Sequence, residues 1–587
     1  MLFSELFFKG RFAVPWHQRY YDWKQNDVRS LLHDINEALE ENRNCYFLGP
    51  VMLVSENTPV DKSKQWEIND GQQRMVTFSL MCAALCRRFA REAKESQREG
   101  LALRILFDLD AHVVSNLDNA EEYTPRITPP KNDTTRYQQM IRGNSIGSNG
   151  TLTTAWNEIN TFITGMNIGK AKDYFDFLLQ RLEVACLWLP ASVDANSVYE
   201  TINWRGKKLE DLDLIRNYLY SHFNTYSDEV RRDTVHEKLE AVRTQIGSAA
   251  KTSEYMRCYF QCKYGFLAKE SFYRRTREAI RAHAGDKDGR VASLSDYVFD
   301  SIVEISSQQL VELFRTITAS HPNIELISTF QKDSNTTHNR RNLGVFLREL
   351  REYKVTQPLI LAMLMRYINE PDRRKKKRIA RIANKNLRRL TSFVLRTAFV
   401  APKFEPSHFE TEFSNFAHNI VAAPEIPDEG FADFLRNSDR SAYGVLQDTK
   451  FKTMMESATM TGKRKIKLFL LGINSALQSD FNVLAEQRCT IEHILPDSQE
   501  HWPSWRGFKD VNCADWINRI GNLTLLGSTD NKPGRNFNSS FAKKRGIYQD
   551  SAIRVTRMLA ANTDWSPYDI ENRQQEMVRH ATEIWQF

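Results

Sequence analysis

The sequence has few cysteines, no long apolar run and no internal repeat, and these absences exclude several classes of protein. Only eight of its 587 residues are cysteines, and no two of them form a CxxC pair. We therefore expect neither a disulfide framework nor a zinc site. Apolar runs such as Leu359 to Met365 are far shorter than the roughly 20 residues of a membrane span. Because the N-terminus also lacks the features of a signal peptide, we expect a cytoplasmic protein with no membrane partner.

The composition is that of an ordinary globular protein with a modest excess of positive charge. Apolar residues make up 41% and charged residues 26% of the chain, and at roughly 150 residues per domain the length predicts two to four domains. The net charge of +8 permits a polyanionic partner. The sharpest basic cluster, Arg373 to Arg389, has apolar residues at helical spacing, which predicts an amphipathic helix with a basic outer face. We interpret that face either as a solvated surface or as a contact for a phosphate backbone.

Strand and helix patterns divide the chain into three segments. Residues 1–225 mix short strands, such as Cys45 to Val54, with helices whose apolar residues recur every three or four positions. Residues 226–400 are mostly helical in pattern, and Ala401 to Glu410 is the best candidate boundary before residues 401–587. These patterns predict a multidomain protein, mainly α with small α+β units, and a helical middle.

The stretch TIEHILPD, Thr490 to Asp497, sets an acid beside a histidine ahead of a proline. A neutral histidine can take a proton from water, and oxygen ligands suit Mg²⁺ or Mn²⁺ better than zinc, so the stretch has parts of a phosphodiesterase. Glu492 and His493 are adjacent, and neighbours on a regular strand point to opposite faces. Both can serve one site only if the strand ends or bulges there, and Pro496 favours such an ending.

More polar residues follow in GNLTLL, in TDNKPG and on the helix predicted after them. Together with EHILP they resemble HNH nucleases of the GmrD type, which have a ββα-metal fold. The resemblance implies that His493 is the general base and that Asn522 orients the base or the phosphate. It implies that Glu492 and Asn531 bind the metal ion. A lone histidine without these companions would instead be interpreted as a structural one. The residues that would face the DNA backbone are Lys543 and Lys544.

The stretch WEINDGQQR places a glycine between a predicted strand and a predicted helix. Gly71 permits a tight turn there, and the backbone N–H groups that start the helix are donors suited to phosphate. Arg74 can add a bidentate contact, and Asp70 can hold a metal ion or position water. Any triphosphatase activity must come from this site, because Gly462-Lys463 does not form a Walker A loop. The simpler alternative is that Asp70 only caps the helix.

The surrounding motifs resemble the GmrS-type domain, which has a ParB/sulfiredoxin-like fold and acts as an NTPase. VPWHQRYYDW, YFLGPVML and DGQQR occur in that family's order, and YETINWRGKKLEDLDLIRNYL matches a further block of it. The resemblance implies catalytic roles for Asp70 and Arg74. In the further block, the polar residues are alternatively interpreted as capping the helix that begins near Leu209. The implied nucleotide contacts are Gln18, Arg19, Gly71, Gln72, Gln73, Arg74, Asn203 and Arg205.

Both motif sets on one chain resemble a fused GmrSD-type enzyme, a type IV modification-dependent restriction endonuclease, and its homologues in BREX phage-defence islands. The resemblance implies cleavage of double-stranded phage DNA that carries hydroxymethylated or glucosylated cytosine, by a nucleotide-controlled homodimer. The implied cofactors are Mg²⁺ or Mn²⁺ and a nucleoside triphosphate, ATP or GTP, with CTP and UTP as alternatives. Two other functions stay open: a phosphorothioate-sensing nuclease of the SspE kind, and a non-enzymatic ParB-like DNA-binding regulator.

Overall fold

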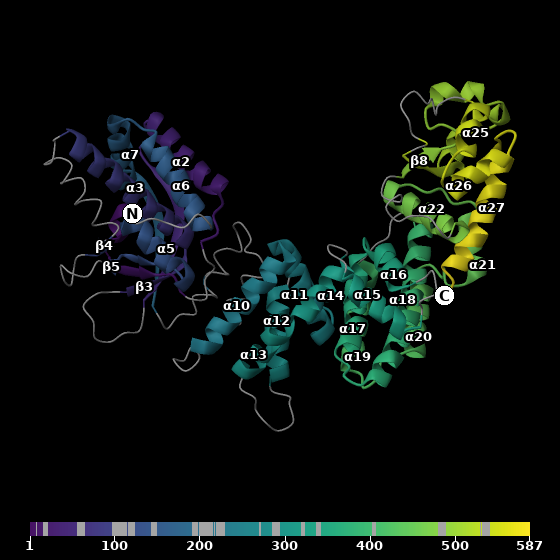
Figure 1. Cartoon of the computed structure of the whole chain (residues 1–587), viewed down its shortest axis with the longest axis horizontal. Coiled ribbons are helices and arrows are strands. Elements are labelled where there is room, and N and C mark those ends of the chain that lie inside the picture. The colour runs from purple at the N-terminus through teal and green to yellow at the C-terminus, as the bar shows by residue number, and fades with distance from the viewer. Residues whose placement is uncertain are drawn as a thin grey trace. The chain divides into compact units, whose positions relative to one another are not determined.

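The computed structural model of the chain is mainly helical (Figure 1). Contacts divide it into two compact units, Met1–His236 and Glu237–Phe587, and each is treated by itself. None of the described helices is long and apolar enough to cross a membrane. The structure describes residues 1–7, 9–15, 21–55, 65–96, 114–115, 124–142, 150–190, 198, 215, 218, 229–268, 272–284, 294–318, 323–335, 342–401, 407–478, 489–528, 530 and 540–587.

The first unit is built on a mixed sheet, which has five strands within the described residues. Across the sheet they are β6 (Ile127–Thr128), β1 (Arg11–Ala13), β3 (Gln65–Asp70), β2 (Tyr46–Ser55) and β7 (Leu182–Leu189). β2 is antiparallel to β3, and the other neighbours are parallel. The strand predicted at Cys45 to Val54 is confirmed as β2, and the strand predicted before Gly71 in WEINDGQQR is confirmed as β3. A separate ribbon pairs β4 (Val114–Ser115) with β5 (Thr124–Pro125).

The helices of the first unit share one hydrophobic core with this sheet. Helix α3 (Gln72–Ser96) buries the apolar residues that recur at steps of three or four positions, as the sequence predicts. They are Met75, Phe78, Cys82, Leu85 and Phe89. Burial raises the pKa of the Cys82 thiol, which is a core residue. The helices are α1 (Phe3–Phe7), α2 (Gln25–Glu40), α3 (Gln72–Ser96), α5 (Lys131–Arg142), α6 (Thr151–Thr164) and α7 (Ile168–Gln180).

The second unit begins with a stack of helices. Pro358 lies in the first turn of α17, where it needs no N–H partner, and nearly every residue of α17 is buried. The basic stretch is confirmed as part of α18, whose N-cap Asp372 accepts a hydrogen bond from the backbone N–H of Lys375. The elements are α10 (Glu229–Ile246), α11 (Ala249–Tyr264), α12 (Phe272–Ala284), α13 (Leu294–Ile305), α14 (Gln308–Ile317), α15 (Ile324–Asp333), α16 (Leu343–Leu350), η3 (Lys354–Thr356), α17 (Gln357–Ile368), α18 (Arg373–Val400), α19 (Ser407–Ala422), α20 (Glu429–Ala442), α21 (Asp448–Glu456) and α22 (Lys463–Leu477).

The last part of the chain holds an antiparallel pair of short strands, β8 (Thr490–His493) and β9 (Leu523–Leu526). Glu492 pairs with Thr524 and His493 with Leu523. Helix α25 (Phe541–Gln549) follows β9 along the chain. The described residues therefore keep the predicted order of strand, strand and helix. The other elements are η4 (Gln499–Ser504), η5 (Arg506–Phe508), α24 (Ala514–Ile517), η6 (Ile520–Asn522), α25 (Phe541–Gln549), α26 (Arg554–Arg557), η7 (Met558–Ala561) and α27 (Pro567–Ile584).

Candidate functional site

The C-terminal candidate site lies where β8 ends. The strand stops at His493, ahead of Pro496, and Glu492 and His493 are its last two residues, both still paired with β9. Burial lowers the pKa of the His493 imidazole, while the side chains of Asn518 and Asp497 oppose this shift. Its Nε2 atom is buried and has no hydrogen-bond partner among the described residues. Burial therefore favours the neutral imidazole, and one ring nitrogen is left without a hydrogen bond from the described residues.

The Glu492 carboxylate is held by a buried lysine. Its Oε1 lies 2.6 Å from Nζ of Lys544, and the two side chains are 14% and 1% exposed. The same ammonium donates to the backbone carbonyls of His493 at 2.8 Å and Ile494 at 2.9 Å. Burial raises the pKa of Glu492, and the neighbouring ammonium opposes that rise by stabilising the charged carboxylate. Lys544 therefore ties α25 to the end of β8 with all three of its donors.

The expectation that Lys544 faces the DNA backbone is wrong. Its side chain is buried, and its three donors are satisfied by protein oxygens at the end of β8. No donor remains for a phosphate at the surface. Lys543, its neighbour on α25, is exposed, and its contact with DNA stays a prediction. The two lysines differ because successive residues on a helix point about 100° apart.

Asn522 is buried, and its side chain binds the loop that follows His493. Its side-chain oxygen accepts from Leu495 N at 2.7 Å and from Trp565 Nε1 at 3.1 Å. Its side-chain nitrogen donates to Leu495 O at 3.1 Å and Ile517 O at 3.0 Å. With the side chain fully buried and all four hydrogen bonds used, Asn522 cannot contact a phosphate. It positions the loop that follows His493, and the other expected role, orienting the base, stays a prediction.

The predicted metal ligands are only partly within the described residues. Asn531 lies outside them, so its convergence with Glu492 stays a prediction. The preceding Asp530 is placed: its carboxylate accepts from Gly527 N at 2.9 Å and from Ser551 Oγ at 2.7 Å. This holds the chain just after β9. Within the described ranges, no group of three or more His, Cys, Asp or Glu residues is arranged to hold a metal ion.

The N-terminal candidate site lies between β3 and α3. Asp70 ends the strand, Gly71 has a φ of 90°, and the helix begins at Gln72. The Arg74 guanidinium lies 3.4 Å from the Asp70 carboxylate and donates to Leu48 O at 3.3 Å. A side chain at Gly49 would collide with this guanidinium. The structure therefore confirms the strand–glycine–helix junction and shows that Arg74 is held from both sides.

The predicted catalytic and nucleotide-binding residues of this site divide into three groups. Gln72 and Gln73 are buried, and the side-chain oxygen of Gln73 accepts from the backbone N–H of Asp22 at 3.0 Å. Gln73 thus already serves to anchor the segment at Asp22, and its nucleotide contact stays a prediction. Asp70 and Arg74 keep partial exposure, at 22% and 18% of their side chains. The residues outside the described ranges are Gln18, Arg19, Asn203 and Arg205.

Several residues of these sites were missed from the sequence. Gly49 gives Arg74 its space, Asn518 adjoins His493, and Trp565 donates to Asn522. Tyr548 is buried beside Glu492, and burial together with that carboxylate raises the pKa of its hydroxyl. Only Asn518 had a local signal, because it lies four residues before Asn522 in the same motif.

Comparison with known protein families agrees with this organisation. The chain matches the GmrSD restriction endonuclease N-terminal domain over residues 3–220. It matches the GmrSD restriction endonucleases C-terminal domain over residues 446–580, which include β8, β9 and α25. No match was found among curated proteins. Since the two domain types occur in order on one chain and together cover more than half of it, the chain belongs to the GmrSD family of type IV restriction endonucleases.

Proposed function

We propose that this restriction endonuclease hydrolyses DNA phosphodiester bonds at the end of β8 by HNH chemistry. The observation that carries the proposal is the half-buried, neutral His493, whose Nε2 has no hydrogen-bond partner among the described residues. A ring nitrogen in this state can accept a proton from the attacking water. Lys544 donates to the backbone carbonyl of His493, and Asn522 accepts from the backbone N–H of Leu495, so the chain at and just after the imidazole is held in place.

Glu492 and Asn531 would hold a Mg²⁺ or Mn²⁺ ion in this proposal. When bound, such an ion stabilises the charge that develops on the leaving oxygen. Glu492 suits the role because a carboxylate is a hard oxygen ligand, and Lys544 opposes the rise of its pKa that burial causes. The ammonium engages Oε1 of the carboxylate, so Lys544 also fixes the orientation of the group that would meet the ion.

The proposed substrate is double-stranded phage DNA with hydroxymethylated or glucosylated cytosine. Membership of the GmrSD restriction endonucleases supports this choice. The test uses matched duplexes that carry plain, methylated, hydroxymethylated or glucosylated cytosine, or phosphorothioate linkages. With Mg²⁺ or Mn²⁺ and nucleotide present, we expect products only from the hydroxymethylated or glucosylated duplexes, and none after chelation of the metal. Cleavage of phosphorothioate DNA alone would instead assign the SspE-like function.

We further propose that a nucleoside triphosphate binds at Asp70–Arg74 and biases a homodimer equilibrium that gates the nuclease. A long helix begins directly after Gly71, so its N-terminal end, which favours anions, faces this junction, and Arg74 is fixed beside it. Gating requires that the nucleotide bind the two states unequally. Measuring oligomer mass and DNA cleavage with and without nucleotide tests this, and unchanged values in both would refute gating.

Replacing Arg74 with alanine is expected to weaken nucleotide binding about 10- to 100-fold. This follows from the loss of a charge-assisted hydrogen bond worth about 1.5–3 kcal/mol. Arg88→Ala is a matched control, because Arg88 lies on the same helix and also forms an i,i+4 ion pair, with Glu92 at 3.3 Å. Titration calorimetry with ATP and GTP gives the two affinities. If both variants lost the same nucleotide affinity, the proposal that nucleotide binds at this junction would be wrong.

A further inference from the structure

Helix α18 carries two parallel rows of basic side chains that differ in their partners. One row, Arg378, Lys385 and Arg389, is neutralised by Glu425, Asp428 and Glu429, with nitrogen–oxygen distances of 2.7–3.1 Å. This is called the paired row. The second row, Arg374, Lys377 and Arg381, repeats at steps of three and four residues and therefore shares one helix face. It is called the unpaired row, because none of its members forms an ion pair among the described residues.

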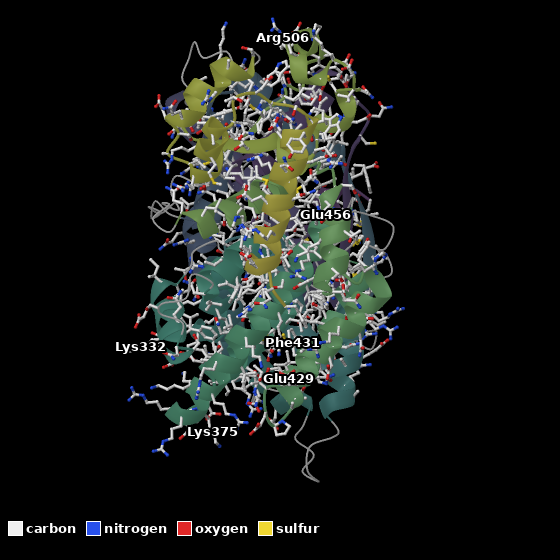
Figure 2. The ribbon with its side chains drawn as sticks, turned by 90° about the vertical axis from the view of Figure 1, so that its right-hand side faces the viewer. Lys332, Lys375, Glu429, Phe431, Glu456 and Arg506 are labelled. Carbon is white, nitrogen blue, oxygen red and sulfur yellow. The ribbon has the colours of Figure 1, made fainter. Side chains whose placement is uncertain are left out.

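The unpaired row is fully on the surface. Arg374, Lys377 and Arg381 are exposed, and the only hydrogen bond that the described residues give them is from Arg381 Nε to Lys377 O at 3.4 Å. The exposed Arg373 and Lys375 flank the row, and Figure 2 shows the Lys375 side chain projecting from the outer edge of the ribbon. Arg374 lies in the first turn of α18, where positive charge opposes the helix dipole, so stability does not explain its placement.

The same helix reaches the core beside the candidate nuclease centre. Leu395 and Phe399, near the end of α18, belong to one hydrophobic cluster with Leu523 and Leu525 of β9. β9 in turn pairs with β8, which ends at His493. At 1.5 Å per residue, the helix from Lys377 to Phe399 is about 33 Å long. That length is close to one turn of B-DNA, roughly 34 Å.

We propose that the unpaired row of α18 binds the phosphate backbone of the DNA substrate. The inference rests on the proposed nuclease function, because that function supplies the polyanion to which the row is complementary. It assigns a role to residues outside the two family matches, which end at 220 and resume at 446. Contacts of this kind are independent of base sequence and weaken steeply with salt. The paired row takes no part, since its charges are already satisfied within the protein.

The test compares two triple variants of the full chain. One is Arg374→Gln, Lys377→Gln, Arg381→Gln, and the matched control is Arg378→Gln, Lys385→Gln, Arg389→Gln. Both carry His493→Ala, so that a labelled duplex of about 30 base pairs, near three helical turns, remains intact during binding. Affinity is measured from low to moderate salt. Thermal unfolding of both variants checks their folding, and the unpaired-row variant is expected to be at least as stable as its parent.

The unpaired-row variant is expected to bind at least about tenfold more weakly at low salt. The slope of log K against log salt should fall in magnitude by about 2.7, for three phosphate contacts at about 0.9 each. The paired-row variant should retain the parent's slope. Equal slopes in the parent and both variants, or equal losses in both variants, would overturn the proposal. The binding result can also separate the two proposals. If only the unpaired-row variant loses binding, while the chain without any substitution cleaves no DNA, the nuclease proposal is overturned and this one stands.

Discussion

Replacing Lys544 with methionine is expected to destabilise the second unit by about 3–5 kcal/mol, as removal of one partner from a buried ion pair does. The pair is nearly inaccessible to water, so solvent cannot replace the lost ammonium. The Glu492 carboxylate and the carbonyls of His493 and Ile494 lose a donor together. Chemical denaturation measures the change. Tryptophan fluorescence can follow it, because the Trp505 ring lies 5.6 Å from the ammonium.

Two further variants separate this explanation from a general effect on α25. Lys543→Met removes the exposed neighbour and should change stability by less than about 0.5 kcal/mol. Adding Glu492→Gln to Lys544→Met should recover part of the loss, because no buried charge is then left alone. If Lys543→Met proved the more destabilising of the two single variants, the assignment of the buried lysine would be wrong.

Replacing His493 with alanine is expected to reduce DNA cleavage by about 10²- to 10⁴-fold or more, the contribution of a positioned general base. If the N-terminal site hydrolyses nucleotide, as the resemblance implies, that activity should persist, since that site lies in the other unit. His501→Ala is the control, because His501 lies in η4, in the same unit, and is 29% exposed. Gel-based cleavage assays under single-turnover conditions give both rates. Retained cleavage in the His493 variant would remove it as the base.

The pH dependence of cleavage gives an independent measure of the same group. Burial lowers the pKa of His493, so its neutral form persists to lower pH than for an ordinary histidine with a pKa of about 6.5. Activity should therefore be constant through neutral pH and fall only as the pH drops below the lowered pKa. This loss of activity at low pH is part of the His493 prediction. A loss that already begins above pH 7 would contradict a neutral His493 imidazole.

The local parts of both sites could be predicted from the sequence. The junction at Gly71 is a property of a few consecutive residues, and the ending of β8 at His493 follows from Pro496 close by. The helix face that α3 buries follows from its apolar spacing. In each case the physical cause lies within a turn or two of the residue concerned, so a single stretch of sequence contains it.

The roles of Lys544 and Asn522 could not be predicted, because their partners are remote in the sequence. Lys544 and Glu492 are 52 residues apart, and Trp565 reaches Asn522 across 43 residues. In AKKRG, nothing local shows which of two adjacent lysines faces inward. The space that Gly49 leaves for Arg74 is likewise a contact between two elements, β2 and α3. Only the tertiary structure distinguishes an exposed lysine from a buried lysine that connects two elements.

The hydrophobic cluster that joins α18 to β9 also bears on how this enzyme can be dissected. Leu395 and Phe399 lie upstream of residue 446, where the C-terminal family match begins, yet they pack in the same cluster as Leu523, Leu525 and Trp585. A truncated expression fragment starting at 446 would leave that cluster open on one side. The end of the long basic helix therefore completes the hydrophobic core of the matched C-terminal region, and a fragment meant to fold should include it.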